Sequence, residues 1–241
     1  YVPNNASLAI AGDINIEETI KLVEKYYNEI PMGKQVPPVN LVHAELNENK
    51  VITLEDKVQL PRLYMAWLST AQYLPGDCES EILANILAGG KNSRLYKKLV
   101  YDLQIAQDIS AFQYNMKIGG SFIIIATAKD GISLERIKEE IIKEIDEIKN
   151  NPPTKRELER TINQFEAAYL SNLESVGGFG GKADLLNQFY FFTGNPDYFN
   201  ENIARYRAVS EKDIQTYAVS YLKNNGCVVL SIVPEGKTDL A

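Results

Sequence analysis

Apolar residues recur at two spacings along the chain, and the two spacings separate predicted strands from predicted helices. Continuous or alternating apolar runs that are bounded by turn residues are typical of strands. Such runs predict strands over residues 7–12, 50–55, 60–69, 105–116, 121–129 and 227–233. The run over residues 60–69 is rich in Leu, Tyr, Met and Trp, which predicts that this strand lies at the centre of a sheet.

The helical spacing is clearest over residues 134–148, where apolar residues three or four positions apart form one face and Lys and Glu form the other. Asp77 and Ser133 are suited to cap helices, and Thr154 with Glu157 forms a capping-box pattern. Helices are predicted over residues 16–30, 77–87, 93–101, 134–148, 154–174, 179–192, 196–207 and 210–222.

The order of these elements indicates an α+β fold. After an opening strand and helix, strands dominate the middle of the chain, helices cluster later, and one strand closes the chain. We expect a two-layer sandwich, in which a mostly antiparallel sheet of about five to six strands carries helices packed on one face.

The pattern also predicts how the chain divides. Periodicity is lost over residues 32–49, which contain Pro37-Pro38 and a polar end, so this stretch is the predicted linker. It separates residues 1–31 from the main domain, residues 50–241. One strand and one helix are too small to fold alone, so residues 1–31 are expected to end an upstream domain. An exposed strand edge invites pairing, which makes a homodimer through residues 1–31 a further expectation.

Composition and charge narrow the function classes. The 241 residues are 45% hydrophobic, and the net charge of −7 opposes nucleic-acid binding, which needs a basic surface. No apolar run approaches the roughly 20 residues that span a bilayer, so no membrane partner is expected. Cys78, Cys227 and the single histidine, His43, oppose a zinc site within the chain. His43 starts half of a deaminase signature whose second half is missing, and it lies in the predicted linker.

A glycine-rich stretch over residues 177–182 has two readings. It differs from a phosphate-binding loop, because Val176 stands where glycine is needed and Ala183 where Ser or Thr is needed. We interpret it as a flexible joint between two helices, with Phe179 anchored in the core. Alternatively, Gly178 and Gly180 let the backbone approach a ligand.

Several stretches together resemble one family. They are VPNNASLAIAGDINIEETIKLVEKYYNEIP near the start, LAGGKNSRLYKKLVYDLQIAQDISA, NLESVGGFGGKADLLNQ and VSEKDIQTYAVSYL. In order and spacing they are similar to the pitrilysin/insulinase-type (inverzincin) zinc metallopeptidases. The resemblance covers essentially the whole chain, and it implies the non-catalytic (inactive) domain that follows the zinc-bearing domain, preceded by the last strand and helix of that zinc-bearing domain.

This resemblance carries implications for individual residues. The family's zinc site, an inverted His-x-x-Glu-His with a distant Glu, would lie upstream, so no catalytic residue and no metal ligand is expected here, and zinc would belong to the parent protein. Many members also use an Arg and a Tyr to hold the substrate backbone. The matching positions are occupied by Val100 and Gln107, so that pair would come from another half. Arg94 matches the family's Ser-Arg-Leu. It is expected either to be structural, covering a helix end, or to face the substrate chamber. Gly178, Phe179 and Gly180 are likewise expected to be either chamber-facing or structural.

The resemblance implies an accessory domain of a zinc-dependent peptidase. It would form part of the substrate chamber, dock the upstream catalytic domain and a second homologous half, contact peptide substrates, and lack hydrolytic activity alone. The alternative is a scaffold subunit of a peptidase-like assembly that has lost proteolytic activity. An unrelated small-molecule enzyme with a ferredoxin-like fold is a third reading, but the sequence offers no catalytic constellation for it. A periplasmic location is expected, with the cytoplasm as the other option.

Overall fold

The computed structural model describes residues 1–39 and 44–241. These residues form two compact units. The helical unit comprises Tyr1–Val42 with Gln164–Ile203, and the sheet unit comprises His43–Asn163 with Ala204–Ala241. The predicted boundaries at residues 31 and 49 and the predicted linker stay a prediction, and His43 lies outside the described residues.

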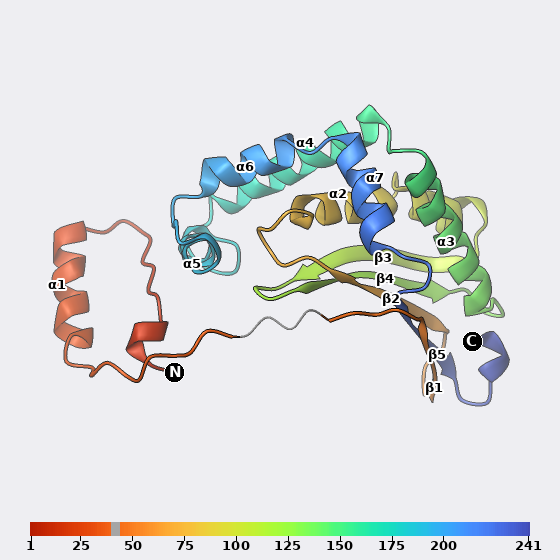
Figure 1. Cartoon of the computed structure of the whole chain (residues 1–241), viewed down its shortest axis with the longest axis horizontal. Coiled ribbons are helices and arrows are strands. Elements are labelled where there is room, and N and C mark those ends of the chain that lie inside the picture. Colours follow the sequence, from red (N-terminus) through yellow and green to blue (C-terminus); the bar gives the residue numbers. More distant parts are fainter. Residues whose placement is uncertain (40–43) are drawn as a thin grey trace. The chain divides into compact units, whose positions relative to one another are not determined.

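The sheet unit is built on one five-stranded sheet (Figure 1). Its strands are β1 (Lys50–Asp56), β2 (Arg62–Ser69), β3 (Ala106–Asn115), β4 (Gly120–Ala128) and β5 (Cys227–Pro234). The order is β1-β5-β2-β4-β3, in which β1 and β5 are parallel and every other pair is antiparallel. The predicted α+β class is confirmed, and β2 is central, as its apolar sequence indicates.

Helices cover one face of this sheet (Figure 1). They are α2 (Asp77–Ala88), α3 (Leu134–Asn150) and α7 (Glu211–Tyr221), with a π-helical segment over Tyr96–Asp102. The sheet unit also contains the start of α4 (Lys155–Asn172) and the end of α6 (Phe199–Arg207). The helical unit contains α1 (Ile16–Tyr27) and α5 (Lys182–Thr193), a short 3-10 turn over Pro3–Asn5, and the remaining parts of α4 and α6. Another 3-10 turn, Thr238–Leu240, follows β5.

The core lies between the sheet and its helices. On β2, Leu63, Met65 and Trp67 alternate inward and are each 1% exposed. The Trp67 indole N–H donates to the backbone carbonyl of Lys223 at 3.0 Å, and its ring meets Phe122 of β4 edge-on at a centroid distance of 6.4 Å. The apolar face of α3, which includes Ile141, is fully buried against this layer.

The predicted caps are confirmed at two helices and wrong at a third. The Ser133 hydroxyl accepts from the Arg136 N–H at the start of α3, and Thr154 and Glu157 bond reciprocally at the start of α4. Asp77 is instead the first residue of α2. Its carboxylate accepts the Tyr73 N–H at 2.8 Å and also pairs with side chains of Asn115 and Arg205. Because these tertiary partners use its oxygens, it does not cap its own helix.

The strand predicted over residues 7–12 is wrong. These residues form no strand in the structure, and Leu8 and Ile10 are exposed. A strand needs a neighbouring strand to bond its backbone, and none pairs with this stretch among the described residues. The helix that follows begins at Ile16 as predicted and ends at Tyr27, three residues before the predicted end.

We predict that Phe122→Ala lowers the free energy of unfolding by about 3–5 kcal/mol, because it removes a fully buried ring. Phe112→Ala is the matched control on the neighbouring strand, where the ring is 40% exposed, and its effect stays below about 1 kcal/mol. Urea unfolding of the 241-residue chain, followed by circular dichroism, measures both. Equal losses for the two variants would contradict the assigned core.

Candidate functional site

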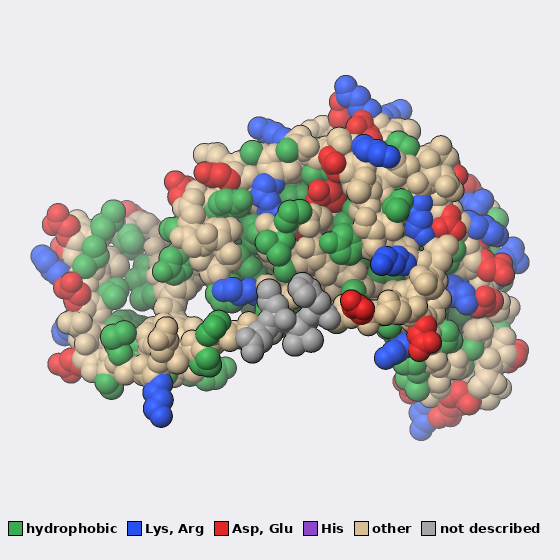
Figure 2. Space-filling model, viewed as in Figure 1, with side chains coloured by type: hydrophobic (Ala, Val, Ile, Leu, Met, Phe, Trp, Pro, Cys, Tyr) green, Lys and Arg blue, Asp and Glu red, His purple; other side chains and the backbone are tan. Residues whose placement is uncertain are grey.

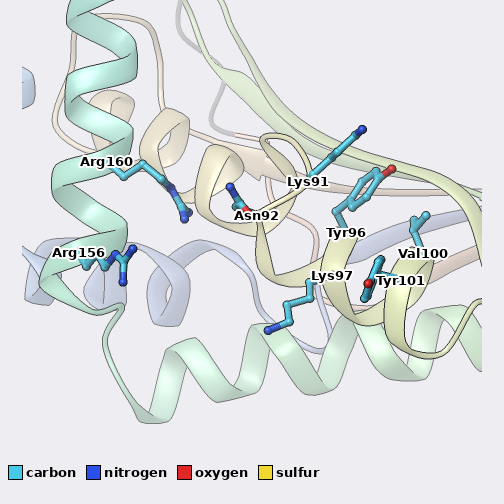
Figure 3. A pocket seen from close by; sticks show the side chains of 8 residues that line it. All are labelled: Lys91, Asn92, Tyr96, Lys97, Val100, Tyr101, Arg156 and Arg160. Atoms are coloured by element: carbon cyan, nitrogen blue, oxygen red, sulfur yellow. The ribbon is translucent and has the colours of Figure 1, made fainter.

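A basic pocket opens on the sheet unit between the end of α2 and the start of α4 (Figure 3). It has a volume of about 670 Å³. Its lining residues come from the loop after α2, the π-helical segment and the first turns of α4. They are Lys91, Asn92, Tyr96, Lys97, Val100, Tyr101, Arg156 and Arg160. Four of the eight carry positive charge and none is acidic, in a chain with more acidic than basic residues.

The π-helical segment shapes one wall of the basic pocket. Sequence periodicity predicts an ordinary helix over residues 93–101, and the structure shows a wider turn in which the Leu103 N–H reaches the Lys98 carbonyl at 2.9 Å. Leu95 and Leu99 are completely buried and fix this segment on the core. The same anchoring leaves Lys97 and Tyr101 exposed and Val100 half-buried at the pocket.

Arg94 joins this wall to α4 and α3. Its guanidinium donates to both carboxylate oxygens of Glu157, at 2.7 and 2.9 Å, and to Glu144 at 3.3 Å. Partial burial alone would raise the pKa of Glu157, but the hydrogen bonds and charge of Arg94, with hydrogen bonds from Thr154, lower that pKa to about 2. These contacts support the structural interpretation of Arg94.

The charges of the four cations in the basic pocket are not balanced by a paired carboxylate among the side chains that the structure describes. In the part of the chain that the structure describes, none of Lys91, Lys97, Arg156 and Arg160 forms an ion pair. Figure 3 shows Arg156 and Arg160 projecting from α4, Lys97 extending from the π-helical segment toward α4, and Lys91 on the side of Tyr96. The pocket is therefore suited to an anionic ligand.

These four cations carry little signal in the sequence and are not among the predicted site residues. The available signal was the spacing of Arg156 and Arg160, which are four residues apart and share one face of a helix. Of the predicted positions, Val100 lines the pocket, and Gln107 is exposed on β3.

The glycine-rich loop over residues 177–181 belongs to the helical unit. Gly178 and Gly180 have φ angles of +82° and +78°, a left-handed conformation that disfavours other residues. The Gly180 N–H donates to the Asp184 carboxylate at 2.8 Å, which places a protein anion where a phosphate loop would hold its ligand. The predicted helix start at 179 is wrong: α5 begins at Lys182, after these turns.

Phe179 is not a core anchor. Its side chain is fully exposed, at 105% of the reference area, because the left-handed glycines on either side carry it outward. An exposed aromatic ring on a glycine-rich loop is available to contact a ligand.

A zinc site requires three or more His, Cys, Asp or Glu side chains that converge on one point. Across residues 1–39 and 44–241, no three His, Cys, Asp or Glu side chains come together as metal ligands, so these residues do not fit a zinc ion. Burial raises the pKa of Cys78 and of Cys227 to about 12, which keeps both thiols protonated at neutral pH. No described helix has the length and apolar character needed to cross a bilayer.

Comparison with known families decides the relationship. The Peptidase M16 inactive domain matches residues 1–165, more than half of the chain. The chain belongs to the Peptidase M16 inactive-domain family. This agrees with the pitrilysin/insulinase-type resemblance of its motifs.

Relatives of this M16 domain include proteins named as zinc proteases. "Zinc protease PqqE" of Helicobacter pylori is 27% identical over 194 residues, which cover 78% of this chain and 43% of that protein. "Uncharacterized zinc protease YmxG" of Bacillus subtilis is 23% identical over 190 residues, covering 77% of this chain and 45% of that protein. The M16 chain thus spans less than half the length of these curated relatives.

Solved structures share the fold of this M16 domain. A protease from Helicobacter pylori matches with a TM-score of 0.81 at 20% identity, over 93% of this chain and 54% of that chain. The peptidase M16 inactive domain from Pseudomonas fluorescens matches with a TM-score of 0.77 at 16% identity, over 92% of this chain and 52% of that one.

We predict that Glu157→Gln lowers the free energy of unfolding at pH 7 by about 1–2 kcal/mol, because the charged pair with Arg94 is lost. The folded-state pKa of about 2 lies below the ordinary 4.5, so the stabilisation by Glu157 is complete above pH 4.5 and is lost as pH falls toward 2. The difference in unfolding free energy between the native chain and the variant, measured by urea unfolding, should therefore become smaller as the pH falls from 5 to 3.

Glu159→Gln is the control, because the Glu159 carboxylate is 60% exposed and 3.7 Å from Lys155, and such pairs contribute little. A Glu157→Gln variant as stable as the native chain at pH 7, or a gap that does not change with pH, would contradict the assigned role of the pair.

Proposed function

We propose that this chain is the accessory domain of a zinc-dependent M16 peptidase, forming part of its substrate chamber without hydrolytic activity alone. The observation that carries this proposal is the match of residues 1–165 to the M16 inactive domain. The names of its longer relatives as zinc proteases support a parent protein that binds zinc. Zinc would supply Lewis-acid activation of the attacking water from another domain, while this chain binds and orients the peptide.

Two features of the described surface suit contact with a peptide. The basic pocket offers charge, the exposed Phe179 offers an aromatic face, and both lie outside the packed core. Val100 and Gln107 occupy the positions of the family's Arg and Tyr. Holding the substrate backbone would accordingly fall to another half of the peptidase, and Arg94 would act by positioning α4.

Residues 1–31 are proposed to dock another domain. The amphipathic α1 has no buried residue, and the side chains of Leu8, Ile10, Ile16 and Ile20 lie exposed around a small apolar cavity. Figure 2 shows hydrophobic side chains gathered on this segment. In the parent protein the upstream catalytic domain would cover them, and in the isolated chain a second copy would do so.

The alternative function is a scaffold subunit that has lost proteolytic activity. The observation in its favour is the replacement of the family's Arg and Tyr by Val100 and Gln107. A parent sequence with a degenerate zinc motif would decide for this alternative, and an intact His-x-x-Glu-His would decide for the peptidase.

We predict that the parent protein hydrolyses a mixture of quenched fluorescent peptides in the presence of zinc, and that a chelator abolishes this activity. The 241-residue chain alone should show none under the same conditions, because no three metal-ligating side chains come together among the described residues. Hydrolysis by the isolated chain would contradict the proposal. If the parent protein hydrolysed none of the peptides in the mixture, the scaffold function would be favoured.

We also predict that the isolated chain dimerises through residues 1–31, because this buries the exposed apolar face of α1. Sedimentation velocity should give a dimer for the native chain and a monomer for Ile20→Glu, whose apolar side chain is 52% exposed. Lys21→Gln, which makes the same change of one charge unit at the next position, is the control and should remain a dimer. If deletion of residues 1–49 left the oligomeric state of the chain unchanged, this prediction would be contradicted.

A further inference from the structure

We infer that the basic pocket binds an acidic peptide segment, in which at least two carboxylates pair with the cations of α4 and the π-helical segment. The inference deepens the proposed function by naming a substrate class, and it rests on that function only for the origin of the peptide. The binding itself follows from the side chains that line the pocket.

The basic pocket carries an excess of positive charge. Glu157 stands between Arg156 and Arg160 in the sequence, yet its carboxylate turns to Arg94 and is occupied there. Glu159 of the same helix pairs with Lys155. The acidic residues of α4's first turns are thus committed to other cations, and the two arginines at the pocket have no carboxylate partner among the described side chains.

The donors at the basic pocket suit a peptide better than a small inorganic anion. Small phosphates are commonly held by free backbone N–H groups of loops and helix starts. Here three such donors are already used: the Thr154 and Glu157 N–H groups bond each other's side chains at the start of α4, and the Ser93 N–H donates to the Gly90 carbonyl at 3.0 Å. Recognition would therefore depend on side chains spread along an open pocket of about 670 Å³, which favours a longer ligand.

The spacing of Arg156 and Arg160 on α4 matches the spacing of alternate residues in an extended peptide. Residues four apart on a helix have neighbouring side chains, with Cβ atoms about 5–6 Å apart. Alternate residues of an extended peptide point to the same side and lie about 6.6 Å apart. A Glu-x-Glu segment could thus present one carboxylate to each of Arg156 and Arg160, whose guanidinium groups bind carboxylates in two-pronged fashion. Tyr96, Tyr101 and Val100 supply apolar contact for the intervening residue.

Fluorescence anisotropy with the full 241-residue chain tests the inference without any need for hydrolysis. The probe is a fluorescein-labelled peptide of alternating Glu and Ser, compared with one of alternating Gln and Ser at equal length. We expect the Glu peptide to bind and the Gln peptide not to bind, and we expect added salt to weaken the binding of the Glu peptide. The double variant Arg156→Gln/Arg160→Gln should weaken it at least about tenfold, in keeping with two lost charge-assisted contacts.

Lys57→Gln/Lys237→Gln is the matched control, because it removes the same charge from exposed positions outside the pocket and should leave affinity within about twofold. Lys91→Gln/Lys97→Gln provides a second pocket variant, and thermal unfolding checks that each variant is folded. The inference would be overturned if the Gln peptide bound as tightly as the Glu peptide, or if both pocket variants kept the native affinity. It would also be overturned if tripolyphosphate displaced the probe at a lower concentration than the unlabelled Glu peptide does. Absence of hydrolysis by the parent would overturn the proposed function and leave this result standing.

Discussion

The ion pair between Arg94 and Glu157 is the contact on which the candidate site depends. A guanidinium that bonds both oxygens of one carboxylate fixes orientation as well as distance. It holds the first turn of α4 against the π-helical segment, and the third bond, to Glu144, adds α3 to the same junction. Arg156 and Arg160 flank Glu157 in sequence, so their position at the pocket follows from this pair. A Lys in place of Arg94 would keep the charge and lose this fixed geometry.

The fold could be predicted from the sequence wherever local periodicity and burial agree. Ile137, Ile141 and Ile145, which are four residues apart, lie on the buried face of α3. The apolar pattern over residues 60–69 likewise corresponds to the alternating burial of β2. Predictions failed where a partner distant in sequence decides the outcome. Residues 7–12 have strand-like composition but no strand to pair with among the described residues. Asp77 has the chemistry of a cap, but side chains from β3 and α6 take its oxygens.

The candidate site was predictable only in part. Motif resemblance brought out Arg94 and the glycine-rich loop, because both carry unusual local sequence. The four pocket cations did not stand out, since single Lys and Arg residues on helices and loops are ordinary surface residues. Their convergence depends on how α4 returns to the loop after α2, a tertiary feature that periodicity does not encode. The outward position of Phe179 likewise depends on left-handed glycine turns rather than on its apolar character.

In the function proposed above, this M16 inactive domain contributes peptide selection to a zinc peptidase. The most direct test of this role is kcat/KM of the parent protein for an acidic and a neutral quenched peptide, measured with and without the Arg156→Gln/Arg160→Gln substitutions. We predict zinc-dependent hydrolysis in which the substitutions reduce kcat/KM for the acidic peptide about tenfold and leave kcat/KM for the neutral peptide unchanged. If the native parent protein and the doubly substituted protein had the same kcat/KM for the acidic peptide, the proposed role in peptide selection would be contradicted.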